Sequence, residues 1–278
     1  MLLRFTKMHG LGNDFMMVDL LSQRTHFDPI TIRELSDRKT GIGFDQLLTV
    51  TPPDDPEADF RYTIYNADGS EAEQCGNGAR CLVRFVRDQG LTTKSLIRLQ
   101  TRTGQITCQL EKDSNITVNM GTPVLQPGRI PFTADMPQIL YDLDLPGSHD
   151  QVSATVVNVG NPHTVITVDD LETAPVASLG PILESHYRFP EKVNVGFMQI
   201  LSRHHIKLRV YERGVGETRA CGSGACAALV AGRLQGLLDE NVEVDLPGGK
   251  LSLSWAGDDS PIMMTGPACR IYEGRLQI

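Results

Sequence analysis

Two cysteines in this sequence occupy the same short motif. Cys75 and Cys221 each lie four residues after a glutamate, and each opens the run Cys-Gly-x-Gly-Ala. The residues that follow favour a helix, so each sulfur should lie at a helix start, near unpaired backbone N–H groups and the positive end of the helix dipole. That environment favours a thiolate over a thiol. The two glycines let the backbone approach a carboxylate closely.

Paired acid/base thiols suit one kind of reaction especially well. Inversion of a stereocentre by proton exchange requires one group to remove a proton from a carbon and a second group to deliver a proton to its opposite face. The helix starts would also stabilise the negative charge that develops on a substrate carboxylate during deprotonation. The alternative is a pair of redundant buried cysteines in a duplicated fold. The polar glycine turns favour a catalytic pair, because polar helix starts seldom bury cysteine without a role.

The helix dipole alone is too weak to tune these thiols. It contributes roughly 0.3–1 kcal/mol, up to ~2 when partly buried, whereas one pKa unit is about 1.36 kcal/mol. Further groups must therefore act on the sulfurs. We expect His163 and Glu212 to do so, because the two halves differ chemically there: Phe15 matches His163, and Asn66 matches Glu212. The alternative for His163 is a loop histidine that caps a turn.

The cysteine motif belongs to a longer repeat that specifies the surrounding elements. Residues 60–65 and 206–211 alternate alike, 97–106 matches 242–251, and Gly12-Asn13-Asp14-Phe15 resembles Gly160-Asn161-Pro162-His163. We interpret the chain as a tandem duplication with one cysteine in each half. Residues 123–147 are proline-rich and without clear period, and we expect them to connect the halves.

The expected fold is α/β of the α+β type, with two pseudo-symmetric domains. Each should be a curved, mostly antiparallel sheet wrapped around a central helix, with the active site in the cleft between the domains. The first domain should comprise residues 1–121 plus 269–278, and the second 122–268. Helices are predicted over 31–38, 78–89, 176–184 and 224–237, and the last of these is apolar nearly all round, as a fully enclosed helix would be.

Composition narrows the function further. The chain has 278 residues, 40% of them hydrophobic and 22% charged, a formal net charge of -8 and a pI of about 5.4. This charge argues against a nucleic-acid partner. The N-terminus lacks a signal-peptide core and no apolar run would span a membrane, so we expect a cytoplasmic protein. Besides the catalytic pair, we expect Cys81, Cys108, Cys226 and Cys269 to be small buried residues, because their spacing does not suit a zinc site or a disulfide framework. No metal is expected.

The sequence closely resembles the diaminopimelate epimerases over almost its whole length. The resemblance is carried by Lys7-Met-His-Gly-Leu-Gly12-Asn13-Asp14-Phe15, Gly41-Ile-Gly-Phe44-Asp45-Gln46, Tyr65-Asn66-Ala-Asp68-Gly69-Ser70, the Cys75 turn, Gly160-Asn161-Pro162-His163, Val193-Asn194 and Tyr211-Glu212-Arg213 through Cys221. These enzymes interconvert LL- and meso-diaminopimelate without a cofactor, on the route to lysine and peptidoglycan.

The resemblance implies a role for each matching residue. Cys75 and Cys221 would be the two bases, and His163 and Glu212 would tune them. Tyr272 would lie at a homodimer contact. Ser223 is a departure, since threonine is frequent there, but its hydroxyl and backbone N–H remain. The residues that would hold substrate are Asn13, Gln46, Asn66, Gly76, Asn77, Asn161, Asn194, Glu212, Arg213, Gly222 and Ser223.

Three other functions fit these residues less well. A proline racemase or hydroxyproline epimerase of the same fold acts on a substrate with one carboxylate, which would leave Arg213 without a purpose. Arg213 offers a bidentate fork for a second carboxylate, and Glu212 a partner for its ammonium. A thiol-disulfide redox protein should carry Cys-x-x-Cys, and a non-catalytic amino-acid binder has no need of matched thiols. No lysine motif for pyridoxal phosphate is evident, so we expect no cofactor.

Overall fold

The computed structural model describes residues 2–72, 75–147 and 149–277. It forms two compact units: unit 1 is Met1–Asn119 with Thr265–Ile278, and unit 2 is Met120–Met264. The sequence placed the boundaries after residues 121 and 268. The crossings come slightly earlier because Met120 already donates its N–H to the Ile262 carbonyl (2.9 Å), within unit 2. On the return, the Thr265 hydroxyl already bonds that of Thr117 (2.8 Å), within unit 1.

The described part of unit 1 is one sheet, mostly antiparallel with two parallel pairs, and two helices. Its strands pair in the order β18–β1–β2–β3–β4–β6–β7–β8, and β5 pairs with β4. Of the described pairs, β2/β3 and β4/β6 are parallel and the rest antiparallel. The elements are β1 (Leu2–Gly10), β2 (Asn13–Asp19), α1 (Pro29–Ser36), β3 (Gln46–Thr51), β4 (Phe60–Asn66), β5 (Glu71–Ala72), α2 (Gly76–Asp88), β6 (Leu96–Thr101), β7 (Gly104–Leu110), β8 (Ile116–Asn119) and β18 (Cys269–Gln277).

Unit 2 repeats this pairing pattern from β9, which corresponds to β18, through β16, which corresponds to β7. Its order is β9–β10–β11–β12–β13–β15–β16, with β14 on β13, and the parallel pairs β11/β12 and β13/β15 correspond to those of unit 1. The elements are η1 (Pro127–Arg129), β9 (Tyr141–Asp144), β10 (Gln151–Asn158), β11 (Pro162–Thr167), α3 (Val176–Glu184), β12 (Asn194–Ser202), β13 (His205–Glu212), β14 (Gly216–Thr218), α4 (Gly222–Leu234), β15 (Asn241–Leu246), β16 (Gly249–Ser254) and β17 (Met263–Gly266, which reaches into unit 1). The tandem duplication is therefore a duplication of topology.

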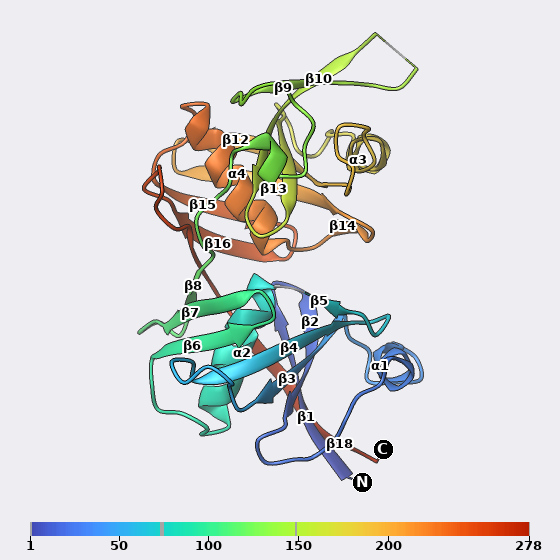
Figure 1. The fold of residues 1–278 in the computed structure, drawn as a ribbon, viewed down its shortest axis with the longest axis vertical. Coiled ribbons are helices and arrows are strands. Elements are labelled where there is room, and N and C mark those ends of the chain that lie inside the picture. The colour runs from blue at the N-terminus through green and yellow to red at the C-terminus, as the bar shows by residue number, and fades with distance from the viewer. Residues whose placement is uncertain (1, 73–74, 148, 278) are drawn as a thin grey trace. The chain divides into compact units, whose positions relative to one another are not determined.

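One helix in each unit packs against the sheet along most of its surface: α2 in unit 1 and α4 in unit 2 (Figure 1). Both are buried through most of their length, and the apolar circumference of α4 explains its enclosure. The predicted fold class is confirmed. Both helices begin two residues earlier than predicted, which makes Cys75 and Cys221 themselves the N-caps. α1 and α3 cover residues 29–36 and 176–184, where helices were expected over 31–38 and 176–184.

Each unit has its own apolar core. In unit 1 it includes Met16, Phe44 and Leu47, and in unit 2 it includes Val195 and Phe197. Apart from Phe44, which precedes β3, these residues lie in strands that also carry candidate site residues, so the core anchors those strands.

Two sequence expectations were wrong. Residues 123–147 are not merely a connection, because they contain η1 and β9, which pairs with β10 and extends the sheet of unit 2. Cys269 is exposed rather than buried, since it lies at the start of an exposed edge strand. Cys81, Cys108 and Cys226 are buried as expected.

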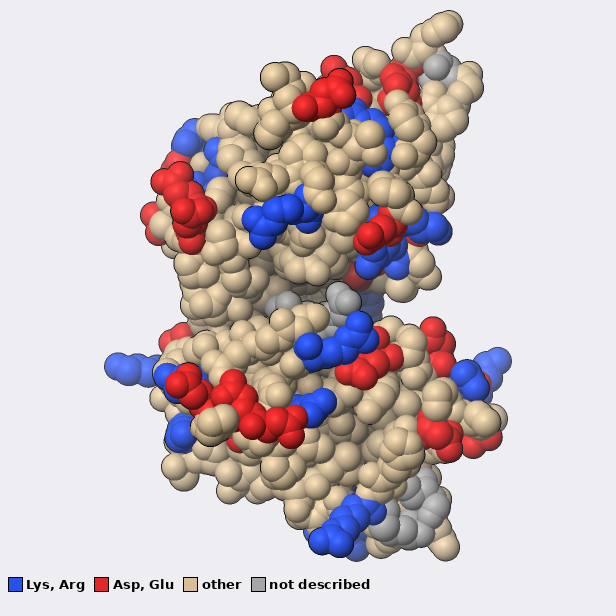
Figure 2. Space-filling model, in the orientation of Figure 1, with Lys and Arg blue, Asp and Glu red and all other residues tan. Residues whose placement is uncertain are grey.

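Charge is dispersed over the visible surface of both units. Lysine and arginine side chains lie among aspartates and glutamates on the face that Figure 2 shows. None of the described helices is long and apolar enough to cross a membrane.

Candidate active site

Cys75 caps the N-terminus of α2. Its backbone is extended, and its Sγ accepts a hydrogen bond from the Gly78 amide at 3.3 Å. Gly78 leaves room for this contact, because a Cβ there would lie 3.0 Å from Leu48 Cδ2 and 3.6 Å from the sulfur. Gly78, the second glycine of the motif, thus helps the first turn of α2 to approach the Cys75 sulfur.

Cys221 caps α4 in the same backbone conformation. Its Sγ lies 3.5 Å from the Ser223 hydroxyl. A Cβ on Gly224 would lie 2.9 Å from Val210 Cγ2 and 3.3 Å from the sulfur, so the space at this glycine is even tighter than at its counterpart in unit 1. The two turns share both their backbone and their steric requirement.

Strand register aligns the other predicted polar residues in each unit. In unit 1, Gln46 on β3 pairs with Phe15 on β2 and with Asn66 on β4. In unit 2, His163 on β11 pairs with Asn194 on β12, and the neighbouring pair Val195–Tyr211 places Glu212 one step further along. The same three strand ends therefore carry the candidate side chains in both halves.

Amide side chains surround Cys75. The Asn13 Oδ1 lies 3.7 Å from the Cys75 sulfur and accepts from Asn77 Nδ2 at 3.3 Å. Gln46 Nε2 donates to Asn66 Oδ1 at 2.9 Å. The buried Gln46 Oε1 has no hydrogen-bond partner among the described residues, which leaves an acceptor available to a ligand.

An ionic network lies behind Asn13. Lys7, only 5% exposed, pairs with Asp14 at 2.5 Å. Arg38 forks onto both oxygens of Asp14 (2.8 and 3.0 Å) and also bonds Asp45 at 2.7 Å. Burial raises the pKa of Asp14, but the hydrogen bonds from Arg38 and Lys7 outweigh it and hold that pKa well below its ordinary value. Asp45 in turn accepts from Asn13 Nδ2 at 3.0 Å.

In unit 2 the asparagine that matches Asn13 is Asn161, and it contacts a buried imidazole. His163 Nε2 lies 3.0 Å from Asn161 Oδ1 and 3.0 Å from the Ser223 hydroxyl, which itself contacts the Cys221 sulfur. His163 has no exposed surface, and burial, with the nearby charge of Arg213, lowers its pKa to about 3. The ring is therefore neutral at physiological pH, and the Ser223 hydroxyl lies between it and the thiol.

Glu212 also acts on Cys221. The Thr218 hydroxyl donates to Glu212 Oε1. Burial first, and then the negative charge of Glu212, raise the pKa of the Cys221 thiol well above its ordinary value, against weaker opposing hydrogen bonds from Ser223 and Gly224. At Cys221, burial and the charge of Glu212 thus act against the thiolate that the helix start was expected to favour.

Asn194 organises the turn that carries Arg213. Its Nδ2 donates to the Pro162 carbonyl (2.9 Å), and its Oδ1 accepts from the Arg213 amide (3.0 Å). The Arg213 side chain is exposed, with Nη1 on the Glu191 carbonyl (3.0 Å). The buried carboxylate of Glu184 fixes the next residue by accepting from its amide at 2.8 Å. Hydrogen bonds from the amides of Arg213 and Gly214 thus fix the turn from which the guanidinium extends.

Comparison with known proteins identifies the family. The family model described as diaminopimelate epimerase matches residues 5–126 and 155–271. The chain belongs to the diaminopimelate epimerase family. Diaminopimelate epimerases of Ectopseudomonas mendocina, Pseudomonas aeruginosa (strain LESB58) and Azotobacter vinelandii are each 56% identical to it over 278 residues, with complete coverage of both chains.

Solved structures share the fold at much lower identity. A hydroxyproline epimerase from Agrobacterium vitis with bound trans-4-hydroxy-L-proline matches with a TM-score of 0.70 and 14% identity, covering 99% of this chain and 92% of that one. A PhzF-family phenazine biosynthesis protein from Bacillus anthracis matches with a TM-score of 0.70 and 15% identity, covering both chains completely. These likenesses show that the epimerase fold is shared by proteins of other names.

The predicted residues of this family member form two contiguous sets. Unit 1 joins Asn13, Cys75 and Asn77, with Gly76 at the helix start and Gln46 bonded to Asn66. Unit 2 joins Asn161, His163, Ser223 and Cys221, with Gly222, Glu212, Asn194 and Arg213 around them. Glu73 and Gln74 of the first cysteine motif lie outside the described residues.

Sequence reasoning missed the supporting charges. Asp14 and Asp45 stand beside the predicted Asn13 and Gln46, and Arg80 lies within the cysteine motif itself. Their position next to predicted site residues was the available signal. Arg80 is completely buried, and its Nη2 donates to Asn77 Oδ1 at 2.9 Å.

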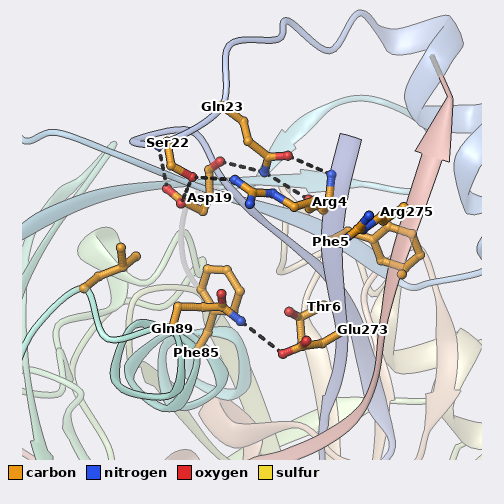
Figure 3. Close-up of a pocket in the computed structure, with 12 residues that line it drawn as sticks. Arg4, Phe5, Thr6, Asp19, Ser22, Gln23, Phe85, Gln89, Glu273 and Arg275 are labelled. Carbon is orange, nitrogen blue, oxygen red and sulfur yellow. Dashed lines mark hydrogen bonds between the residues drawn. The ribbon is translucent and has the colours of Figure 1, made fainter. Parts of the chain in front are cut away.

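A cavity of about 520 Å³ lies elsewhere in unit 1. It is lined by the C-terminal part of α2 and by β1 and β18, including Phe85, Gln89, Arg4 and Glu273 (Figure 3). None of the predicted substrate-binding residues lines it. Tyr272 lies next to one of its walls on β18, is 44% exposed, and packs edge-on against Phe5.

A group of possible metal ligands in unit 2 is already paired with a lysine side chain. Among the described residues, His205, Glu243 and Asp245 could converge on an ion. Lys250 Nζ lies 2.5 Å from Glu243 and 3.3 Å from Asp245, so the ammonium balances both carboxylates. The cluster forms an ordinary ion-pair network on neighbouring strands.

Proposed function

We propose that this protein interconverts LL- and meso-diaminopimelate, with Cys75 and Cys221 as paired acid/base groups. The observation that carries the proposal is that each cysteine is the N-cap of its unit's central helix, in matching turns of a duplicated fold. Family membership supplies the substrate. The matched thiols supply the chemistry, because a single carbon must lose a proton on one face and gain one on the other.

In each direction one sulfur, as thiolate, takes the α-proton, so that the C–H bond breaks and an S–H bond forms. The electron pair left on the carbon is delocalised into the α-carboxylate, which the amides at the helix starts stabilise. The other sulfur, as thiol, delivers its proton to the opposite face. The raised pKa of Cys221 favours the thiol form of that residue. The reverse reaction exchanges the two roles.

The end of the substrate that does not react needs its own contacts. We assign its carboxylate to Arg213, whose exposed guanidinium is aimed by Asn194, and its ammonium to Glu212. The unpartnered Gln46 Oε1 offers a further acceptor for a substrate N–H. Asn66, Asn161, Gly76, Gly222 and the other predicted binding residues would complete the polar lining.

A proline racemase or hydroxyproline epimerase activity is the second candidate, on the strength of the shared fold alone. It is disfavoured by full-length identity of 56% to diaminopimelate epimerases. Arg213 also argues against it, since a substrate with a single carboxylate would leave that guanidinium unused.

The remaining proposals concern context. The reaction would need no cofactor and would serve lysine and peptidoglycan-precursor synthesis in the cytoplasm. We propose a homodimer with Tyr272 at the contact, because β18 pairs with β1 and presents Ile271 and Tyr272 at its surface. Sedimentation of the purified chain should give twice its mass of 30.6 kDa, and Tyr272→Ala should give monomers.

Incubation in D2O tests the activity directly. The purified chain, supplied with LL-diaminopimelate alone, should form the meso isomer with deuterium at the inverted carbon. L-proline and trans-4-hydroxy-L-proline under the same conditions should exchange no α-proton. Turnover of either cyclic amino acid in preference to diaminopimelate would refute the proposed substrate.

A further inference from the structure

The hydrogen bonds around Cys75 form a chain with a fixed direction. Arg80 Nη2 donates to Asn77 Oδ1 (2.9 Å), Asn77 Nδ2 donates to Asn13 Oδ1 (3.3 Å), and Asn13 Nδ2 donates to Asp45 Oδ2 (3.0 Å). A guanidinium can only donate and an ionised carboxylate can only accept. The two ends therefore determine which way both intervening amides must face.

The direction of this chain decides which atom of Asn13 faces the Cys75 sulfur, which also accepts from the Gly78 amide at 3.3 Å. With Nδ2 committed to Asp45, Asn13 must turn Oδ1 toward Cys75 Sγ, 3.7 Å away. An oxygen acceptor there favours the protonated thiol. An amide that turned the other way would present N–H groups and favour the thiolate.

Both ends of the chain are held in place. Arg38 bonds the other oxygen of Asp45 at 2.7 Å, and the Asp14 amide donates to Asp45 Oδ2 at 3.1 Å. At the other end Arg80 is completely buried, and its Nε donates to the Pro267 carbonyl at 3.2 Å. Gly10 leaves space for it, because a Cβ there would lie 3.2 Å from Arg80 Nη2.

We propose that Asp45 is a positioning residue, which holds the Asn13 amide with its oxygen toward Cys75 and so favours the protonated form of that thiol. Neither Asp45 nor Arg80 has a charged counterpart in unit 2, where Val193 and Cys226 take the matching places and a neutral histidine contacts the matching asparagine. The positioning device belongs to one thiol of the pair. Its importance for catalysis rests on the proposed function, but its effect on the sulfur does not.

Alkylation of the thiol tests the proposal without turnover. Purified wild-type and D45N proteins are treated with iodoacetamide across a range of pH, and modification of Cys75 and Cys221 is followed separately by peptide mass spectrometry. In D45N a neutral amide, which can donate as well as accept, replaces the charged acceptor, so only Asn77 still fixes the direction of the Asn13 amide, and the midpoint of Cys75 alkylation should fall by about one pH unit. Cys221 should be unchanged. D54N, which removes another exposed carboxylate of unit 1 that is paired with an arginine, should leave both profiles as in the wild type.

A second pair of variants separates positioning from direct charge. Tyr62 on β4 and Cys81 on α2 also interact electrostatically with Cys75, but both are present in every variant, so they do not account for a difference between variants. Loss of the Asp45 charge could itself lower the midpoint, so the same substitution is made in an Asn13→Ala background. Positioning predicts that D45N then has little effect, whereas a direct charge effect would persist undiminished. That persistence, or an unshifted Cys75 profile in D45N, would overturn the proposal.

The readout also stays separate from the activity. Should D45N not fold, D45S replaces it, since serine likewise removes the carboxylate. If the wild-type protein fails to epimerise diaminopimelate but D45N shows the predicted shift, the proposed function is contradicted and the positioning role stands. If the wild type epimerises diaminopimelate but D45N shows no shift, the positioning role is contradicted and the proposed function stands.

Discussion

Cys75 and Cys221 stand at the same place in two copies of one fold, yet different side chains lie near them. Both cap a central helix, both are followed three residues later by a glycine, and each unit has an asparagine at or just before the start of a matching strand, Asn13 of β2 and Asn161 before β11. In unit 1 that asparagine bonds a carboxylate held by an arginine. In unit 2 it contacts a buried neutral histidine.

The difference shows which features a duplication preserves and which it leaves free to change. Backbone turns and strand register are preserved because the core beneath them depends on both. The side chains that determine proton affinity have diverged: Phe15 and Asn66 occupy the positions of His163 and Glu212. A substrate with one reacting and one non-reacting end gives such divergence a purpose, since only one half needs to hold the second end.

The shared feature of the two halves is tested by removing each sulfur. Cys75→Ala and Cys221→Ala should each reduce epimerisation by roughly 10²–10⁴-fold or more, because each removes a group that exchanges a proton with the carbon. Steady-state rates from both isomers measure this.

The same two variants also break the symmetry. Each should exchange the α-proton of only one isomer with deuterium, and the isomer should differ between the variants. Proton magnetic resonance of the recovered substrate detects this. Near-wild-type epimerisation by either variant would require a one-base mechanism.

Glu212→Gln should have the next largest effect. Loss of the negative charge lowers the pKa of the Cys221 thiol and removes the proposed partner of the substrate ammonium. A hydrogen bond to a charged group contributes about 1.5–3 kcal/mol, so kcat/KM should fall about 10–100-fold. The alkylation midpoint should shift downward at Cys221 and not at Cys75. Glu217→Gln, which breaks an ion pair with Arg209 nearby, serves as the control.

His163→Phe makes unit 2 resemble unit 1 at one position. Phenylalanine is already accommodated at the matching Phe15, so the variant should fold while kcat falls about tenfold, within the range of a lost tuning contact. The decisive readout is stability against pH. The pKa of His163 is about 3 when folded and near 6.5 when unfolded, so the unfolded state binds more protons between these values.

The stability that comes from a neutral His163 is therefore complete above pH 6.5 and is lost as the pH falls toward 3. At pH 5 the loss amounts to about 2 kcal/mol. Between pH 7.5 and pH 5, wild type should lose about 2 kcal/mol more unfolding free energy in urea than His163→Phe does. Equal losses of unfolding free energy in the two proteins would show that the imidazole takes up its proton as readily in the folded state as in the unfolded state.

Much of this comparison was accessible from the sequence. The repeated Cys-Gly-x-Gly turn predicted a cysteine near the start of each helix, though not as the N-cap itself, and the alternation of 60–65 and 206–211 predicted the strands that carry Asn66 and Glu212. The pKa of Cys221 could not be predicted, because burial comes from packing by residues distant in sequence. The role of Asp45 was missed for a different reason: the direction of a hydrogen-bond chain depends on which atoms meet. β9 was missed because four residues among prolines give little periodic signal.

Ser223→Thr should have the smallest effect, and it tests how the imidazole reaches the sulfur. The Ser223 hydroxyl lies 3.0 Å from His163 Nε2 and 3.5 Å from Cys221 Sγ, so it connects the two. Threonine keeps that hydroxyl and adds one methyl group, so kcat should stay within about threefold of wild type. Ser223→Ala removes the connection, and kcat should fall about tenfold, as far as in His163→Phe. The double variant should then be no slower than either single one, because both act through the same contact. Losses that multiply in the double variant would show that His163 and Ser223 act on Cys221 independently.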